Sequence, residues 1–340
     1  SSRWEFQEGT PYSFEIINDR IAVQFNSPFE LYYNSDKDGG TIFGTKGVYY
    51  VMDNEWIGQG GKVDWGRTGL SSAQVWATLN TYTANTKFPK FTADSVLFVN
   101  KQYFKEPVVG HLEEQLMNQM PPEKYNFPKF RSYKKDFIIP NIMKDVDYKG
   151  SFMMNGSKFI TSDSKNPATL IFYRNQKPFI IASAYKFLLT PEKAVSEVAD
   201  VKIYIDGDSI FNSGVSLRYV SGDKKLSMIN ASKRNYYSPY TNTYHNLDMY
   251  CEDITWDMAS DELYLSMLRQ QGTQSYSSFE SSDYYSLKKY LEIQGIDQIS
   301  PLQRVYRYMR DRQSSAFYLD EFAQSVRMDI MQAKLMIHNL

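Results

Sequence analysis

The sequence predicts a mainly β protein, with a β-solenoid (β-helix-like) body followed by a small α-helical module. Aromatic residues make up 16% of the 340 residues, and they favour the pleated, half-buried surfaces of strands. Short apolar runs alternate with turn-forming clusters over most of the chain. Near the C-terminus the hydrophobic period lengthens to that of helices. We therefore expect a β body at residues 1–268, a linker at 269–283 and a helical module at 284–340.

Residues 11–65 are strand-like throughout. The runs SFEIIN, IAVQF and FELYY are apolar or alternate, and the turn cluster NSDKDGG follows them. From Gly39 to Gly69 glycines recur between short strand segments, as stacked coils with tight corners require. This recurrence of glycines between short strand segments is the first indication of a solenoid.

A degenerate element recurs further along the chain, in which a strand meets a polar corner and an aromatic residue follows. It occurs in FTADSVLF, MMNGSKFI, IDGDSIF and CEDITW. Stacked coils bury a continuous core, and Asp, Asn, Ser and Gly suit their corners. We therefore expect Asp208 and Asp253 at equivalent corners of stacked coils. The spacing of the element varies, so a β-sandwich or barrel stays open as an alternative.

Two short helices are predicted within the β body. In GHLEEQLMNQM, Leu112 and Leu116 fall on one helical face, and TPEKAVSEV offers Thr190 as an N-cap before a proline. The stretch PPEKYNFPKFRSYKK between them is predicted to be a surface loop. The Gln-, Ser- and Gly-rich residues 270–283 predict a linker with little regular structure.

Three short helices are predicted after the linker. Ser300 and Pro301 open the first. The apolar faces are Leu302, Val305, Tyr306 and Met309 in the first helix, Leu319, Phe322, Ala323 and Val326 in the second, and Ile330, Ala333, Ile337 and Leu340 in the third. Because the chain stops inside the third helix without a C-cap glycine, we expect the module to be truncated.

This ending, with FYLDEFAQSV and RMDIMQAKLMIHNL, resembles the helical half of a winged-helix domain, which implies a DNA-recognition helix. Groove reading needs Arg, Lys, Asn or Gln on the outward face. The expected outward residues are Asp329, Met331, Gln332, Lys334, Leu335 and His338. With two apolar residues among them and a net charge of -1 on the whole chain, we expect no nucleic-acid partner.

Several site classes are excluded. A single cysteine, Cys251, excludes a disulfide framework or a multi-cysteine metal site. The three histidines are far apart, so no metal site is expected, and no phosphate loop or nucleophile elbow indicates a cofactor. The longest apolar stretch, residues 178–189, is too short to span a bilayer, so no transmembrane segment is expected.

Two acidic clusters are the weak catalytic candidates. Asp206 and Asp208 lie two apart on a predicted strand and so share a face. Glu252, Asp253 and Asp257 form the second cluster, in which Asp253 and Asp257 are the candidates. Paired carboxylates perform glycoside hydrolysis. The commoner role of such residues is to cap strand corners, so no catalytic residue is assigned.

Aromatic residues are the other functional indication. Tyr236, Tyr237, Tyr240 and Tyr244 cluster in NYYSPYTNTYHN, and Trp56, Trp65 and Trp76 lie elsewhere. Exposed aromatic rings stack on sugars or contact partner chains. We predict the tyrosine cluster as the binding residues, with packing in the core as the alternative.

The phrases GTKGVYY, GGKVDW, FTADSVLFVNKQYF, YHNLDMY and LEIQGIDQISPLQRVYRY are similar to large, uncharacterised secreted or envelope proteins of Bacteroidota-type bacteria. The resemblance implies an extracytoplasmic address and a longer parent chain, but no reaction. The expected function is a non-catalytic scaffold or interaction protein of the envelope, with a protein or polysaccharide partner. The alternative is a carbohydrate-binding or carbohydrate-cleaving β-helix protein.

Overall fold

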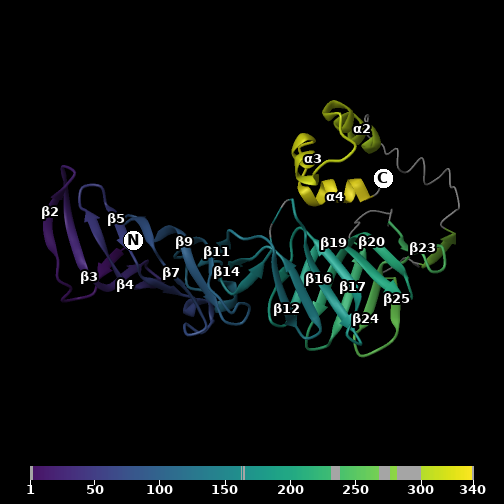
Figure 1. Ribbon diagram of the computed structural model, residues 1–340, viewed down its shortest axis with the longest axis horizontal. Helices are drawn as coiled ribbons and strands as arrows, with labels where there is room; N and C mark the ends of the chain where they lie inside the picture. Colours follow the sequence, from purple (N-terminus) through teal and green to yellow (C-terminus); the bar gives the residue numbers. More distant parts are fainter. Residues whose placement is uncertain are drawn as a thin grey trace. The chain divides into compact units, whose positions relative to one another are not determined.

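The computed structural model describes residues 3–161, 163, 165–230, 238–267, 276–281 and 300–338 (Figure 1). It is mainly β, with 55% strand and 11% helix, as predicted. The chain forms two compact units. Unit 1 comprises Ser1–Phe137 and Ser151–Ile160, and unit 2 comprises Ile138–Gly150 and Thr161–Leu340. The predicted β body of residues 1–268 therefore includes all of unit 1 and part of unit 2.

Unit 1 is built from antiparallel strands. Its pairings run from β3 through β4, β5, β8, β9, β10 and β11 to β14 and β15. The elements are β1 (Arg3–Phe6), β2 (Ser13–Ile17), β3 (Arg20–Asn34), β4 (Gly39–Tyr50), β5 (Glu55–Gln59), β6 (Lys62–Asp64), η1 (Gly66–Thr68), β7 (Val75–Thr78), β8 (Thr81–Asn85), β9 (Lys90–Asn100), β10 (Val108–Gln115), η2 (Pro122–Lys124), β11 (Lys129–Ser132), β14 (Met153–Asn155) and β15 (Lys158–Ile160).

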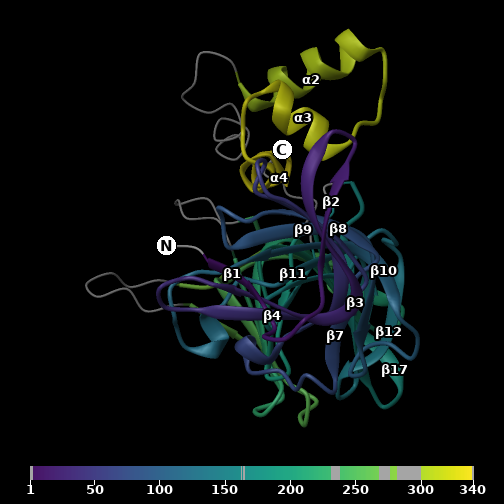
Figure 2. The same cartoon turned by 90° about the vertical axis from the view of Figure 1, so that its left-hand side faces the viewer.

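The long strand β3 organises the start of unit 1. β4 pairs with one edge of β3, and its register shifts between Phe25 and Phe29, around Pro28. Such bulges bend a strand, and Figure 2 shows the bend in β3 (purple). β1 and β2 pair with the two ends of the other edge. Asn18 and Asp19 have φ of 51° and 61°, as a two-residue hairpin turn between β2 and β3 requires.

The core of unit 1 is aromatic. Phe98 stacks on Phe130 with ring centroids 4.3 Å apart, and Phe152 packs within 4.8 Å of Phe159. Trp65 is fully buried against Phe98 at 5.0 Å. The high aromatic content therefore serves the interior of the sheet.

Unit 2 is a second set of antiparallel strands, paired in the order β13, β16, β17, β19, β20, β21, β24, β25, with β22, β23 and β26 branching from β20. The strands are β12 (Phe137–Met143), whose first residue belongs to unit 1, β13 (Val146–Gly150), β16 (Ala168–Arg174), β17 (Lys177–Ala184), β18 (Leu188–Leu189), β19 (Lys193–Ile205), β20 (Asp208–Val220), β21 (Lys225–Asn230), β22 (Tyr240–Asn242), β23 (Leu247–Tyr250), β24 (Asp253–Asp257), β25 (Leu263–Ser266) and β26 (Ser278–Ser281).

A solenoid is not confirmed in either unit. Among the described residues, consecutive strands such as β16 and β17, or β19 and β20, reverse through tight turns and pair antiparallel. The register also shows that the prediction for Asp208 and Asp253 was wrong. Asp253 lies opposite Ile229, which lies opposite Ser216, eight residues beyond Asp208 on β20. The polar corner precedes or begins a strand at β15, β20 and β24, whereas Asp94 and Ser95 lie inside β9, where Ser95 has φ of 54°. The element therefore occupies different positions in the sheet.

The two helices predicted within the β body are strands. In β10, burial alternates, with Leu112 and Glu114 on the inner face. In β19, Ala194, Ser196 and Val198 are buried in the same alternating way. Both strands pair with a neighbouring strand at each edge. This pairing outweighs the small intrinsic helix propensity of their residues. The predicted surface loop between them contains β11, where Phe130 is fully buried.

The three C-terminal helices are confirmed as α2 (Pro301–Arg312), α3 (Leu319–Ser325) and α4 (Ile330–His338). The Ser300 side chain accepts a hydrogen bond from the Gln303 amide, as an N-cap does. Their small core contains Phe322, Ala323 and Ala333. The face predicted for α2 is partly wrong, because Leu302 and Tyr306 are exposed while Val305 and Tyr308 pack inward.

Two further predictions for the C-terminal region, the exposure of Lys334 and an unstructured linker, differ from the structure. Lys334 was expected to face outward, but it is buried, with Nζ 3.1 Å from Asp200 Oδ1. The predicted linker lies partly outside the described residues, and its described part includes β26, which pairs with β23. Among the described helices, none has the length and apolar character to cross a membrane.

Candidate functional site

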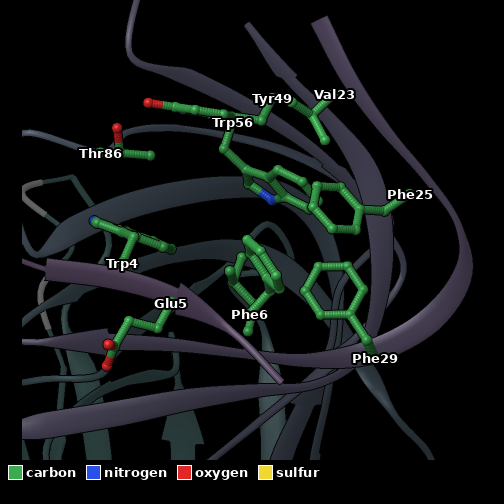
Figure 3. Close-up of a pocket in the computed structure, with 10 residues that line it drawn as sticks. Trp4, Glu5, Phe6, Val23, Phe25, Phe29, Tyr49, Trp56 and Thr86 are labelled. Atoms are coloured by element: carbon green, nitrogen blue, oxygen red, sulfur yellow. The ribbon is translucent and has the colours of Figure 1, made fainter. Parts of the chain in front are cut away.

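An apolar pocket of about 240 Å³ lies in unit 1, among the described residues (Figure 3). Its interior is formed by three buried rings. The centroid of Phe25 lies 4.9 Å from that of Phe29, and both lie 5.8 Å from that of Trp56. The full lining is Trp4, Glu5, Phe6, Val23, Phe25, Phe29, Leu31, Tyr49, Trp56 and Thr86.

Local sequence explains why the rings converge. In a regular strand, the side chains of residues four apart lie on one face but more than about 10 Å from each other. The bulge around Pro28 bends β3, and this bend brings the rings of Phe25 and Phe29 together in the interior. Trp56 is held by a hydrogen bond from Nε1 to the Tyr82 hydroxyl at 3.0 Å. A Cβ at Gly58 would lie 2.6 Å from that indole nitrogen, so glycine is required there. The inner part of the pocket is therefore preformed.

The polar groups of Trp4, Thr86 and Glu5 at the pocket already have partners. Trp4 Nε1 donates to the Phe88 carbonyl at 2.9 Å, and the Thr86 hydroxyl donates to the Asn54 carbonyl at 3.2 Å. The Glu5 carboxylate pairs with Arg3 and accepts from Asn34, and Figure 3 shows it directed away from the rings. The pocket thus offers mainly ring surface, which suits an apolar group.

An exposed apolar strip extends from the pocket along the β2–β3 hairpin. The pocket residue Val23 lies opposite Phe14 on β2 and opposite Tyr49 on β4, so these side chains share a face. Ile16 and Ile21, also paired, lie on that face. Phe14 is 72% exposed and Ile16 is 78% exposed. We call Phe14, Ile16 and Ile21 the hairpin strip.

The two predicted acidic clusters do not come together. Asp253 and Asp257 lie on β24, opposite Ile229 and Lys225 of β21. Asp208 begins β20, eight residues before Ser216, the residue of β20 that aligns with Asp253 across β21. Asp206 is in the turn before β20. The register therefore separates the clusters along the strands.

Each of these carboxylates has a local structural partner or a turn position. Asp208 accepts from the Thr243 hydroxyl at 3.1 Å, and Asp257 accepts from the Ala259 amide at 2.9 Å. Asp253 accepts from the Ser227 and Thr255 hydroxyls, both at 2.7 Å. Asp206 has φ of 45°, a value that Asp tolerates in tight turns. These contacts fit the capping role of corner residues.

The predicted tyrosine platform is only partly described. Tyr236 and Tyr237 lie outside the described residues. Tyr240 is buried, its hydroxyl donates to the Met228 carbonyl at 2.6 Å, and burial raises its pKa well above the usual range. Tyr244 is exposed, with its ring 4.7 Å from that of His245. The prediction is therefore wrong for Tyr240, which is a core residue.

A second hollow, of about 440 Å³, lies in unit 2 where four hairpin turns meet. Its lining is polar. Lys144 and Lys224 form no ion pair with the described residues, whereas Arg174 pairs with Asp261. The full lining is Lys144, Asp145, Tyr173, Arg174, Asn175, Gln176, Tyr219, Ser221, Lys224, Met258, Ala259 and Asp261.

A buried ion cluster lies elsewhere in unit 1. The Arg67 guanidinium pairs with both Asp38 and Glu114, and all three side chains are largely buried. Burial raises the pKa of the Glu114 carboxyl to about 7, against the opposing attraction of Arg67. Across the described part of the chain, no group of three or more His, Cys, Asp or Glu residues could hold a metal ion.

Comparison with known proteins adds no relative. No family model matches the chain, and neither a curated protein nor a solved structure does. The aromatic pocket was missed by sequence reasoning, which treated IAVQF and FELYY as separate strands and left Trp56 open between an exposed ring and a core residue. The available signal was Pro28 between two aromatic-rich halves of one strand, which indicates a bend that turns both halves inward.

Proposed function

We propose that this chain is a non-catalytic interaction protein, and that its aromatic pocket binds one apolar side chain of a partner polypeptide. The observation that carries the proposal is the preformed pocket of Phe25, Phe29 and Trp56 beside an exposed apolar strip. Contiguous exposed apolar surface on a folded protein marks interaction sites. Aromatic anchors in such pockets supply much of the affinity of protein interfaces.

The size and chemistry of the pocket favour a side chain over a sugar. Its volume of about 240 Å³ is below the range of about 300–1,000 Å³ of most small-molecule sites. A sugar bound there would find few partners for its hydroxyls, because Thr86, Trp4 and Glu5 are already engaged and most of the remaining lining is apolar. A phenyl or indole ring carries few such groups.

A binding role is also supported over glycoside cleavage. Asp206 lies in the turn before β20 and so does not share a strand face with Asp208, and the register separates Asp208 from Asp253 by eight residues along the strands. Cleavage by a pair of carboxyl groups requires them about 5–10 Å apart across one bond. The envelope address proposed from the sequence resemblance is compatible with an interaction protein, and cell fractionation of the source organism would test it.

The test uses ligand-observed saturation-transfer NMR with N-acetyl-phenylalaninamide as the probe and methyl glucoside as the comparison. We expect transfer to the phenyl protons, and not to the sugar. Val23→Phe, which narrows the pocket mouth, should abolish the transfer, whereas Val51→Phe on the exposed surface should preserve it. Absence of transfer to the phenyl ring, or equal transfer to the sugar, would overturn the proposal.

The polar hollow of unit 2 favours a second candidate function, carbohydrate binding. Its tyrosine, amide and hydroxyl groups suit a polyhydroxylated ligand. Lys144 and Lys224, which form no ion pair with the described residues, favour an acidic one. Calorimetry should detect binding of a uronic-acid oligosaccharide that weakens in Lys144→Ala and at high salt. No heat with either acidic or neutral oligosaccharides would remove this candidate.

A further inference from the structure

We infer that β2 is a docking edge, to which the partner adds an extended strand with a basic residue flanked by apolar residues. The inference rests on the proposed function, because it names the class of polypeptide that would reach the aromatic pocket. Three features carry it: a free backbone edge, the hairpin strip and the charge of Glu15.

The outer edge of β2 is free among the described residues, where β2 pairs only with β3. The two-residue turn at Asn18 and Asp19 makes Ile17 and Arg20 a hydrogen-bonded pair, and such pairs alternate along an antiparallel ladder. The backbone N–H and C=O groups of Phe14 and Ile16 therefore point outward. These are the groups that an added strand would pair with.

This edge has only part of the usual protection. Natural edge strands carry charged side chains, above all lysine, or proline or a bulge, which prevent pairing with other chains. The β2 sequence Ser-Phe-Glu-Ile-Ile has one charge, Glu15, but no lysine or proline, and it pairs with β3 without a register shift. Phe14 and Ile16 expose most of their surface on the face that leads to the pocket. A partner strand with apolar residues on this face would cover them.

Glu15 determines the charge of the partner. It projects from the opposite face of β2, accepts a hydrogen bond from Ser13 at 2.9 Å and forms no ion pair with the described residues. A second copy of β2, added antiparallel with Phe14 opposite Ile16, would place Glu15 directly opposite its own counterpart. Like charges directly opposite are destabilising, whereas opposite charges stabilise a cross-strand pair. A lysine or arginine between two apolar residues fits this edge.

The experiment measures fluorescence anisotropy of two labelled peptides with the full chain at about 0.15 M salt. One is Thr-Val-Lys-Val-Thr and the other has glutamate in place of lysine, both with blocked ends. We expect the lysine peptide to bind at least tenfold more tightly. Glu15→Lys should reverse this preference, and because Glu15 is exposed the variant should keep the native circular dichroism and melting temperature.

Other outcomes would overturn the inference. The first three are equal binding of both peptides, no binding of either peptide, and an unchanged preference in Glu15→Lys. The fourth is that the wild type sediments as a dimer while Ile16→Lys sediments as a monomer. The dimer would show a second copy as the occupant of the edge. If the phenylalanine probe still binds while neither peptide does, the docking edge is wrong and the proposed function of the pocket stands.

Discussion

At the scale of single residues, Glu114 makes the stability of unit 1 depend on pH. It is buried on β10 beside Arg67, and its Oε2 atom has no hydrogen-bond partner among the described residues. Burial raises its pKa from about 4.5 to about 7, so the folded state binds the proton more tightly than the unfolded state. Its stabilising contribution is fully present below about pH 4.5 and is lost as the pH rises through about 7.

Glu114→Gln should remove this dependence, because glutamine is neutral throughout the range. Between pH 4.5 and 8, the wild type should lose at most about 3 kcal/mol relative to this variant. Urea unfolding at a series of pH values measures the difference. Glu113→Gln changes the adjacent, partly exposed carboxylate and should follow the wild type. Parallel pH profiles for the wild type and Glu114→Gln would contradict the prediction.

At the scale of elements, the sequence correctly predicted whether a segment is a helix or a strand where one local signal was strong. Ser300 before Pro301 fixed the start of α2 because a cap and a proline act within one turn. The segment of β10 was predicted as a helix because Leu112 and Leu116 match helical spacing, and that of β19 because Thr190 before a proline matches a helix start. Their strand state depends on neighbours distant in the sequence, β9 for β10 and β17 for β19. No local pattern carries that information.

The candidate site was harder to predict than the elements that form it. Phe25, Phe29 and Trp56 come from two strands whose pairing with β4 brings them together. Sequence reasoning instead favoured clusters of like residues, such as the tyrosines near Tyr240. Clustering along the chain does not determine exposure, and Tyr240 is buried. Side chains converge at a site through register and bends, which must be known before the site can be seen.

The helix α2 provides the prediction at this scale. Its residues are partly or fully exposed, so packing contributes less to it than to a buried helix, and the cap at Ser300 contributes more. Ser300→Ala should destabilise α2 by about 1 kcal/mol and speed amide exchange in its first turns about fivefold. Hydrogen exchange measured by mass spectrometry would show this. Gln303→Ala keeps the backbone amide that the cap binds and should leave exchange unchanged; equal effects of both variants would refute the role of the cap.

At the scale of the whole molecule, the sequence predicted one β body where the structure has two units. The chain leaves unit 1 after Phe137 and returns to it for residues 151–160. That return is caused by pairing of β14 with β11, through contacts such as Phe130 opposite Met154. Composition does not change across this region, so neither a linker nor a break marks the boundary. A boundary set by pairing leaves no local sign in the sequence.

If the two units are separate cooperative blocks, a core mutation in one should leave the unfolding of the other unchanged. Phe152 is buried in unit 1 among several rings, including Phe104 at 4.7 Å. Phe172 is equally buried in unit 2, 5.3 Å from Tyr219. Truncation of a buried phenylalanine to alanine costs about 3–5 kcal/mol. Each variant should therefore lower one thermal transition by several degrees.

Differential scanning calorimetry of the full chain measures both transitions, and tryptophan fluorescence assigns them. Trp4, Trp56, Trp65 and Trp76 report on unit 1, and Trp256 reports on unit 2. Phe152→Ala should lower the transition reported by the four tryptophans of unit 1. Phe172→Ala should lower the transition reported by Trp256. A single transition that both variants lower equally would mean that the units fold as one block, because cooperative unfolding spreads the loss of any core contact over the whole block.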